Sequence, residues 1–198
     1  QQNKWVYYEN DSSKLNYNVT ENYIEPMKLP QYYQADDRWG TKRYGLSNMK
    51  LTGCVPTALA MAISGLKEDV NPVQVADFLY SMTMELNTTF LGTSSLGVQE
   101  VVSQWGLNYK VIDSKEELEK TLKNGTLVYG AVGHGIFVNG YSTHAVLLTG
   151  YENGKTKAFD PDNMAKTNKW YDIDDIWKER SLAPEDNMTG GAFIAIYK

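Results

Sequence analysis

Residues 53–63 are Gly53-Cys54-Val55-Pro56-Thr57-Ala58-Leu59-Ala60-Met61-Ala62-Ile63, an apolar run that begins beside the only cysteine of the chain. A run that is apolar almost all round predicts a buried central helix rather than an amphipathic surface helix. Pro56 suits the first turn of a helix, where no N–H is lost, so we expect Cys54 at or just before the N-cap. We expect Gly65 to end the helix as a left-handed cap.

A cysteine at the beginning of a helix is well placed to be a thiolate. Free backbone N–H groups and the positive end of the helix dipole both stabilise an anion there. The alternative is a structural cysteine, because unpaired cysteines are usually buried and pack as small hydrophobic residues. The residues that accompany Cys54 must therefore decide between a nucleophile and an inert thiol.

Composition excludes several classes of function. The chain has 198 residues, 42% of them hydrophobic, which fits one domain. Its 19 basic and 24 acidic residues give a net charge of −5, which argues against a nucleic-acid partner. No apolar stretch approaches the roughly 20 residues of a transmembrane segment. One cysteine and two histidines favour neither a disulfide nor a metal site, and we expect no cofactor.

The order of the predicted elements indicates an α+β fold, a helical half packed on an antiparallel sheet. We expect residues 1–28 to form an extended N-terminal arm and residues 29–198 to form one domain. Helices are predicted over residues 55–63, 72–84, 95–105 and 115–124, with caps at Asn71 and Ser114. Strands are predicted over residues 109–112, 127–132, 144–151, 155–160 and 192–197.

A cysteine nucleophile needs a base near neutral pH, and imidazole is the suitable side chain. The two histidines are His134, between glycines in a predicted loop, and His144, which begins an apolar strand. A strand edge holds a side chain on a rigid scaffold, so we favour His144.

The histidine needs an acceptor on its second ring nitrogen, and Asp160 is the nearest candidate. A two-residue turn at Asn153-Gly154 would set His144 opposite Asn163 and turn Asp160 to the other face of the sheet. A bulge would return Asp160 to the face of the sheet that carries His144. Asn163 therefore stays an alternative orienting residue.

Acyl transfer also needs donors for the developing oxyanion. The Cys54 N–H is one donor, and a side-chain amide could be the second. We favour Gln34, which begins the polar segment Gln34-Ala35-Asp36-Asp37-Arg38-Trp39-Gly40.

Four motifs together carry a resemblance to a known family. They are Gln34-x-Asp36-x-Arg38-Trp39-Gly40, Gly53-Cys54-x-Pro56-Thr57-x-x-Ala60-Met61, His144-Ala145-Val146-Leu147-Leu148-Thr149-Gly150-Tyr151 and Phe159-Asp160-Pro161. Over roughly residues 28–198 the chain resembles the free-standing bacterial relatives of the double-glycine leader peptidases, which are papain-like cysteine peptidases. The resemblance implies a papain-like fold and a site of Cys54, His144, Asp160 and Gln34.

The resemblance implies a cysteine peptidase that acts on peptides, proteins or cell-wall peptides, secreted or at the surface of a Gram-positive bacterium. The chain begins with Gln1, so we expect a mature or trimmed form from which a targeting segment is missing. Two alternatives remain. One is a binding module without turnover, which the 14 tyrosines and 5 tryptophans would suit. The other is a transpeptidase, in which an amine rather than water accepts the acyl group.

Overall fold

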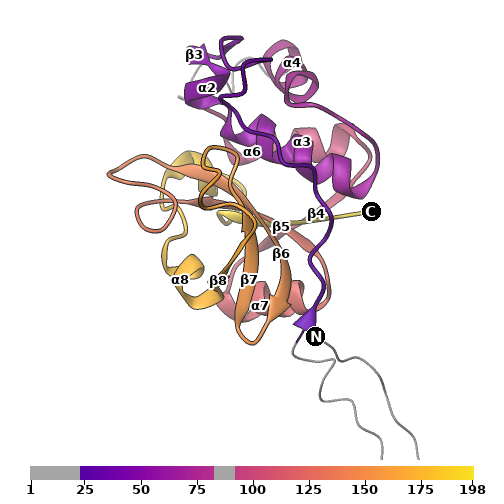
Figure 1. Cartoon of the computed structure of the whole chain (residues 1–198), viewed down its shortest axis with the longest axis vertical. Helices are drawn as coiled ribbons and strands as arrows, with labels where there is room; N and C mark the ends of the chain where they lie inside the picture. Colours follow the sequence, from indigo (N-terminus) through magenta and orange to yellow (C-terminus); the bar gives the residue numbers. More distant parts are fainter. Residues whose placement is uncertain (1–22, 83–91) are drawn as a thin grey trace, which may run out of the picture.

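The computed structural model describes residues 23–82 and 92–198, which form a helical half packed on a sheet (Figure 1). The helical half contains α2 (Met49–Thr52), α3 (Cys54–Leu66), α4 (Pro72–Met82) and α6 (Ser95–Gln104), together with the small hairpin of β2 (Arg43–Tyr44) and β3 (Ser47–Asn48). This arrangement confirms the predicted α+β class.

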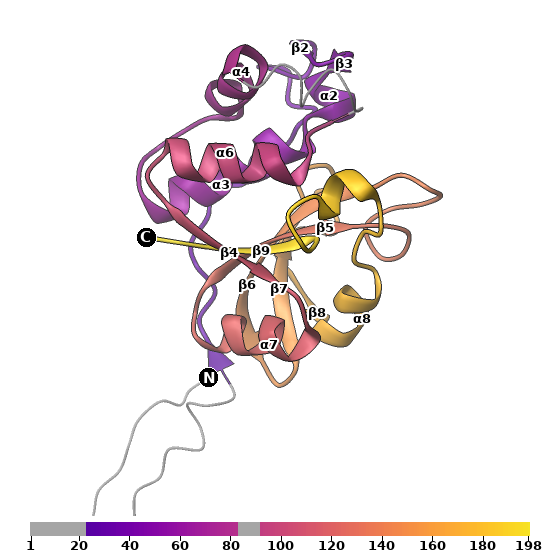
Figure 2. The same ribbon diagram turned by 180° about the vertical axis from the view of Figure 1, so that it is seen from behind.

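The sheet is antiparallel and lies under the helical half. Its strands follow the order β4 (Asn108–Ile112), β9 (Phe193–Tyr197), β5 (Leu127–Val132), β6 (His144–Glu152), β7 (Lys155–Phe159) and β8 (Lys169–Asp172), and β1 (Tyr23–Ile24) also pairs with β6. Figure 2 shows α7 (Lys115–Lys123) and α8 (Ile173–Lys178) at the end of the molecule opposite α4. A short 3-10 helix, η1 (Pro184–Asn187), precedes β9.

The central helix α3 is buried as the sequence predicts. Every residue from Val55 to Ile63 is buried, and the helix packs against β6. The expectation for Gly65 is wrong, because the helix continues through it to Leu66. A Cβ on Gly65 would lie 2.3 Å from the Leu29 side chain, so the glycine serves the close approach of another segment rather than a cap.

The other predicted helices also form, and the structure shows the side-chain caps at which they begin. Asn71 caps α4 by accepting the Gln74 N–H at 3.0 Å, and Ser114 caps α7 by accepting the Glu117 N–H at 3.1 Å. The described part of α4 ends at Met82, so the predicted end at residue 84 lies outside the described residues. The four longer predicted strands form as β5, β6, β7 and β9. The strand β8 and the helix α8 were not predicted.

A bulge in β6 sets the register that matters for the site. The turn at Asn153-Gly154 forms, with φ of 48° and 84°, and pairs Glu152 with Lys155. Between Thr149 and Glu152 the register shifts by one residue. This bulge, which the sequence left open, brings Asp160 to the same face as His144.

Gly150 makes the bulge possible, and replacing it tests the register. Its φ is +79°, and a Cβ would lie 2.7 Å from the Pro26 ring. We expect Gly150→Ala to lower the free energy of unfolding by about 2 kcal/mol, from the left-handed backbone and the clash together. Gly154→Ala is the control, because Gly154 has a similar φ of +84° but no atom within 4 Å of a Cβ. Urea unfolding of both variants measures the difference, and equal losses would contradict the role of the Pro26 contact.

In the described ranges, no helix is long and apolar enough to cross a membrane. The predicted arm over residues 1–28 lies largely outside the described residues, and its division from residues 29–198 stays a prediction. The described end of that segment, β1, is joined to β6 of the sheet.

Candidate active site

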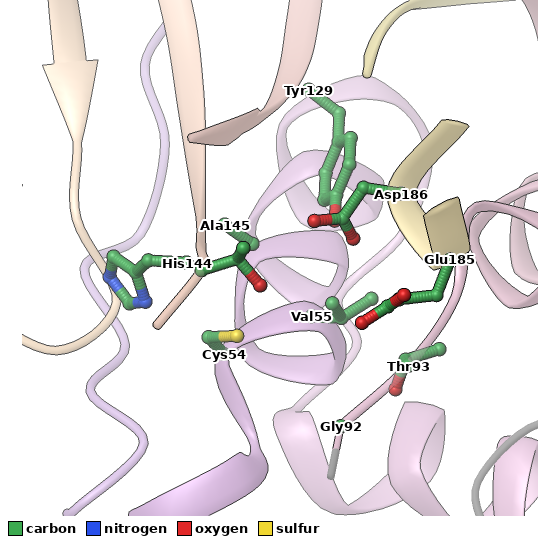
Figure 3. A pocket seen from close by; sticks show the side chains of 10 residues that line it. Cys54, Val55, Gly92, Thr93, Tyr129, His144, Ala145, Glu185 and Asp186 are labelled. Atoms are coloured by element: carbon green, nitrogen blue, oxygen red, sulfur yellow. The ribbon is translucent and has the colours of Figure 1, made fainter. Parts of the chain in front are cut away.

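Cys54 is the first residue of α3, directly after the N-cap Gly53, whereas the sequence predicted Cys54 at or just before the N-cap. Gly53 is the N-cap and gives no side-chain hydrogen bond, so the first N–H groups of the helix are not covered by a capping side chain. A Cβ on Gly53 would lie 2.5 Å from the Met49 carbonyl oxygen, so the tight passage from α2 into α3 requires glycine. The thiol is half-buried and faces a pocket (Figure 3).

His144 stands at the beginning of β6 and connects Cys54 to Asp160. Its Nε2 lies 2.6 Å from Asp160 Oδ1, with the two side chains 10% and 1% exposed. The Cys54 side chain lies next to the imidazole (Figure 3), and hydrogen bonding to it and its charge both raise the pKa of the ring. The bond to Asp160 therefore holds the ring with the Cys54 thiol beside it.

Backbone donors hold the Asp160 carboxylate in place. Its Oδ1 accepts N–H groups from Asp162 at 2.8 Å and Asn163 at 3.3 Å, in addition to the His144 ring. Its own N–H donates to Thr167 Oγ1 at 3.0 Å. The carboxylate is therefore positioned by the turn that follows β7, before any ligand binds.

The electrostatics of the site favour a protonated His144. Burial lowers the pKa of this imidazole, but the hydrogen bonds to Asp160 and Cys54 and their negative charge outweigh it, so the pKa is raised from 6.5 to about 10. At neutral pH the ring is then an imidazolium next to a thiol, the arrangement that stabilises a thiolate.

The two alternatives from the sequence do not reach the site. His134 is exposed in its loop, where its Nδ1 accepts the Gly140 N–H at 3.2 Å. The Asn163 side chain accepts the Ala165 N–H at 2.8 Å and so serves its own turn. Asp160 is the residue that contacts His144.

Gln34 joins the segment before Cys54 to the segment after Asp160. Its side-chain Nε2 donates to the Lys50 carbonyl at 2.9 Å, and its backbone N–H donates to the Pro161 carbonyl at 2.8 Å. The residue is only 4% exposed, and its Oε1 is buried without a partner among the described residues. The bond to Lys50 fixes which end of the amide is the donor, and no other residue in the described ranges accepts the second N–H of Nε2.

The pocket beside Cys54 contains residues that the sequence did not single out. Figure 3 shows Tyr129, Glu185 and Asp186 across the pocket from His144. Tyr129 lies within the fully buried strand β5, and the two acids lie in η1, far along the chain from Cys54. No local motif marks them, because tertiary packing alone brings them together. Within the described residues, no three His, Cys, Asp or Glu side chains gather as metal ligands would.

Comparison with solved structures shows the same fold in three peptidases. A C39-like peptidase from Bacillus anthracis is 16% identical, with a TM-score of 0.58 over 88% of this chain and 98% of that one. The peptidase domain of Streptococcus ComA, a bifunctional ABC transporter involved in quorum sensing, is 17% identical, with a TM-score of 0.52 over 79% and 96%.

The third is a double glycine motif protease from an AMS/PCAT transporter, solved with its leader peptide. It is 18% identical, with a TM-score of 0.50 over 87% of this chain and 91% of that one. The sequence model of the Peptidase_C39 like family matches residues 27–189. No curated protein sequence matches the chain.

Proposed function

Because the chain belongs to the Peptidase_C39 like family of cysteine peptidases, we propose that it cleaves peptide bonds through Cys54, His144 and Asp160, with Gln34 and the Cys54 N–H as oxyanion donors. The observation that carries the proposal is His144, which is hydrogen-bonded to Asp160 and lies next to Cys54. The bonds of Gln34 to Lys50 and Pro161 support its place near the reacting carbonyl.

The chemistry follows from these positions. The Cys54 thiolate attacks the substrate carbonyl, and the negative charge on the carbonyl oxygen is met by the Cys54 N–H and the free N–H of Gln34. His144 gives its proton to the leaving amine, which departs and leaves a thioester on Cys54. His144 then takes a proton from water as the water attacks the thioester, and the carboxylic acid product leaves as the Cys54 thiolate and the His144 imidazolium are restored.

The test of this pairing is the rate at which iodoacetamide alkylates Cys54 from acid to alkaline pH. We expect wild type to react rapidly near pH 6. His144→Ala should react at about one tenth of that rate or below it, because an isolated thiol is almost entirely protonated at this pH. His134→Ala is the matched control, since that ring lies exposed in its loop. A thiol in wild type that reacts only at alkaline pH, unchanged by the mutation, would overturn the proposal.

Gln34 can be tested separately from the nucleophile. We expect Gln34→Ala to lower kcat for peptide cleavage by about 10²-fold, because an oxyanion donor acts on the developing charge. Alkylation of Cys54 should stay within a few-fold of wild type, because that reaction develops no oxyanion. A proportional loss of both rates would instead indicate a structural role for the Gln34 bridge.

Substrates are proposed to be peptides, including the peptide stems of cell wall. The double glycine motif protease with a bound leader peptide supports a peptide substrate on this fold. A double-glycine leader is not proposed as the substrate of this chain. The assembled contacts of His144 favour turnover over a binding module. A secreted or surface location in a Gram-positive bacterium stays a prediction, which fractionation of the producing cells would check.

A further inference from the structure

One wall of the pocket has no part in the proposed mechanism. It consists of Tyr129, Glu185 and Asp186, and we call it the acidic wall. In Figure 3 it faces Cys54 and His144 across the pocket, so a group bound against it would lie beside the reacting carbonyl. The pocket is continuous with the nucleophile rather than a separate surface feature.

Asp186 is a buried carboxylate without a cation. Its side chain is 7% exposed, and its Oδ2 accepts the Ser181 hydroxyl proton at 2.6 Å. Burial raises the pKa of the Asp186 carboxyl. Neither Asp186 nor Glu185 forms an ion pair within residues 23–82 and 92–198. A desolvated carboxylate in this position is stabilised by any cation that enters the pocket.

Tyr129 gives a second, independent indication of a ligand. It is 3% exposed, yet its hydroxyl reaches the pocket, as Figure 3 shows. In the part of the chain that the structure describes, this hydroxyl makes no hydrogen bond. The hydroxyl is open to the pocket although the rest of the side chain is buried, so a polar atom of a molecule bound there can hydrogen-bond to it.

The acidic wall is held rigidly by its neighbours. The Ser181 N–H donates to the Ala131 carbonyl of β5 at 2.8 Å, which ties the segment before η1 to the sheet. Asn187 Nδ2 donates to the carbonyls of Ser181 at 3.0 Å and Ala183 at 2.9 Å. A wall fixed in this way loses little conformational entropy when it binds a ligand.

We propose that the acidic wall binds a cationic nitrogen of the substrate, an ammonium or guanidinium group, next to the carbonyl that Cys54 attacks. The N–H groups of such a cation donate to the Asp186 and Glu185 carboxylates and to the Tyr129 oxygen. The inference rests on the proposed function, because it makes these residues a specificity site of the same reaction. The cation comes from a lysine or arginine side chain or from a free N-terminal amine.

The test uses two thiol reagents of similar size, so it does not depend on a known substrate. Cationic aminoethyl methanethiosulfonate and neutral methyl methanethiosulfonate are compared by the ratio of their rates at Cys54. We expect the ratio to fall about tenfold in Asp186→Asn, since a charge-assisted hydrogen bond is lost. Asp162→Asn is the control, because it removes one charge from an exposed side chain in the turn after Asp160.

The outcomes separate the two proposals. A neutral reagent that reacts as slowly as with an ordinary thiol counts against the proposed function. A fast neutral reaction, with equal ratios in Asp186→Asn and Asp162→Asn, overturns the acidic wall alone. Should Asp186→Asn fail to fold, Glu185→Gln and Tyr129→Phe take its place, and wild-type ratios in both would overturn the inference.

The source of the cation is found with peptides that wild type cleaves from a random library. Each is compared with its N-acetylated form and with the form in which norleucine replaces lysine. A fall of about tenfold in kcat/KM on acetylation assigns the wall to a terminal amine, and a fall on the norleucine change assigns it to a side chain. No effect of either change would contradict the acidic wall.

Discussion

Cys54→Ala is expected to abolish peptide cleavage, the largest effect of any single substitution in this chain. The thiolate forms the bond to the substrate carbonyl, and the chain has no second cysteine to replace it. Removal of a nucleophile leaves only the oxyanion donors and binding, which in other hydrolases is a loss of about 10⁶-fold. The measurement is the appearance of new peptide termini from a random library, followed by mass spectrometry.

The variant should keep its fold, so the loss can be assigned to chemistry. Cys54 is half-buried at the first position of α3, and alanine is the best helix former. Ala58→Gly is a suitable control for stability, because it perturbs the same helix from within and leaves the thiol in place. Turnover in Cys54→Ala at the wild-type rate would remove Cys54 from the mechanism, and retained peptide binding without cleavage in wild type would favour a binding module.

Local patterns were sufficient for the parts of the site that lie on α3 and β6. The run after Cys54 and the strand after His144 are apolar on all sides, so each must lie in the interior of the protein. Both were therefore predicted correctly, one as a buried helix and the other as a buried strand. Gly65 was misinterpreted because a glycine near a helix end resembles a cap, whereas here it meets Leu29 from a distant segment.

The register of the β6–β7 hairpin was the hardest part to predict. The Asn153-Gly154 turn alone points Asp160 away from His144, and the one-residue shift at Gly150 reverses this. An isolated glycine inside a strand pattern is itself a signal for a bulge. The sequence offered that signal, but the contact with Pro26 that fixes it is visible only in the folded chain.

Other elements lack any local signal. Helix α8 has six residues, of which only Ile173 and Ile176 are buried, so its periodicity is too short to recognise. Tyr129 belongs to a strand that is buried on both faces, and alternation cannot show which of its side chains meets the site. Asp186 lines the same pocket as Cys54 only because the fold brings η1, which packs against α6, next to it.

Asp160 is expected to act in two ways that different substitutions separate. Asp160→Ala removes both the acceptor for His144 Nε2 and the negative charge, and we expect kcat to fall on the order of 10³-fold because the ring loses its orientation. Asp160→Asn keeps an oxygen acceptor at the same place and removes only the charge. We therefore expect the asparagine variant to retain much more of kcat than the alanine variant.

The charge should be visible in the pH profile. His144 must be protonated to serve the leaving amine, and its pKa is raised to about 10, in part by Asp160, so wild-type activity should fall only as the pH rises toward that value. Without the carboxylate the pKa is lower, so the alkaline limb of kcat/KM in Asp160→Asn should move to lower pH. Asp162→Asn removes a neighbouring exposed charge and should leave the limb where it is. An alkaline limb at the same pH in Asp160→Asn and wild type would mean that the carboxylate only orients the ring, and that another group holds the proton on His144.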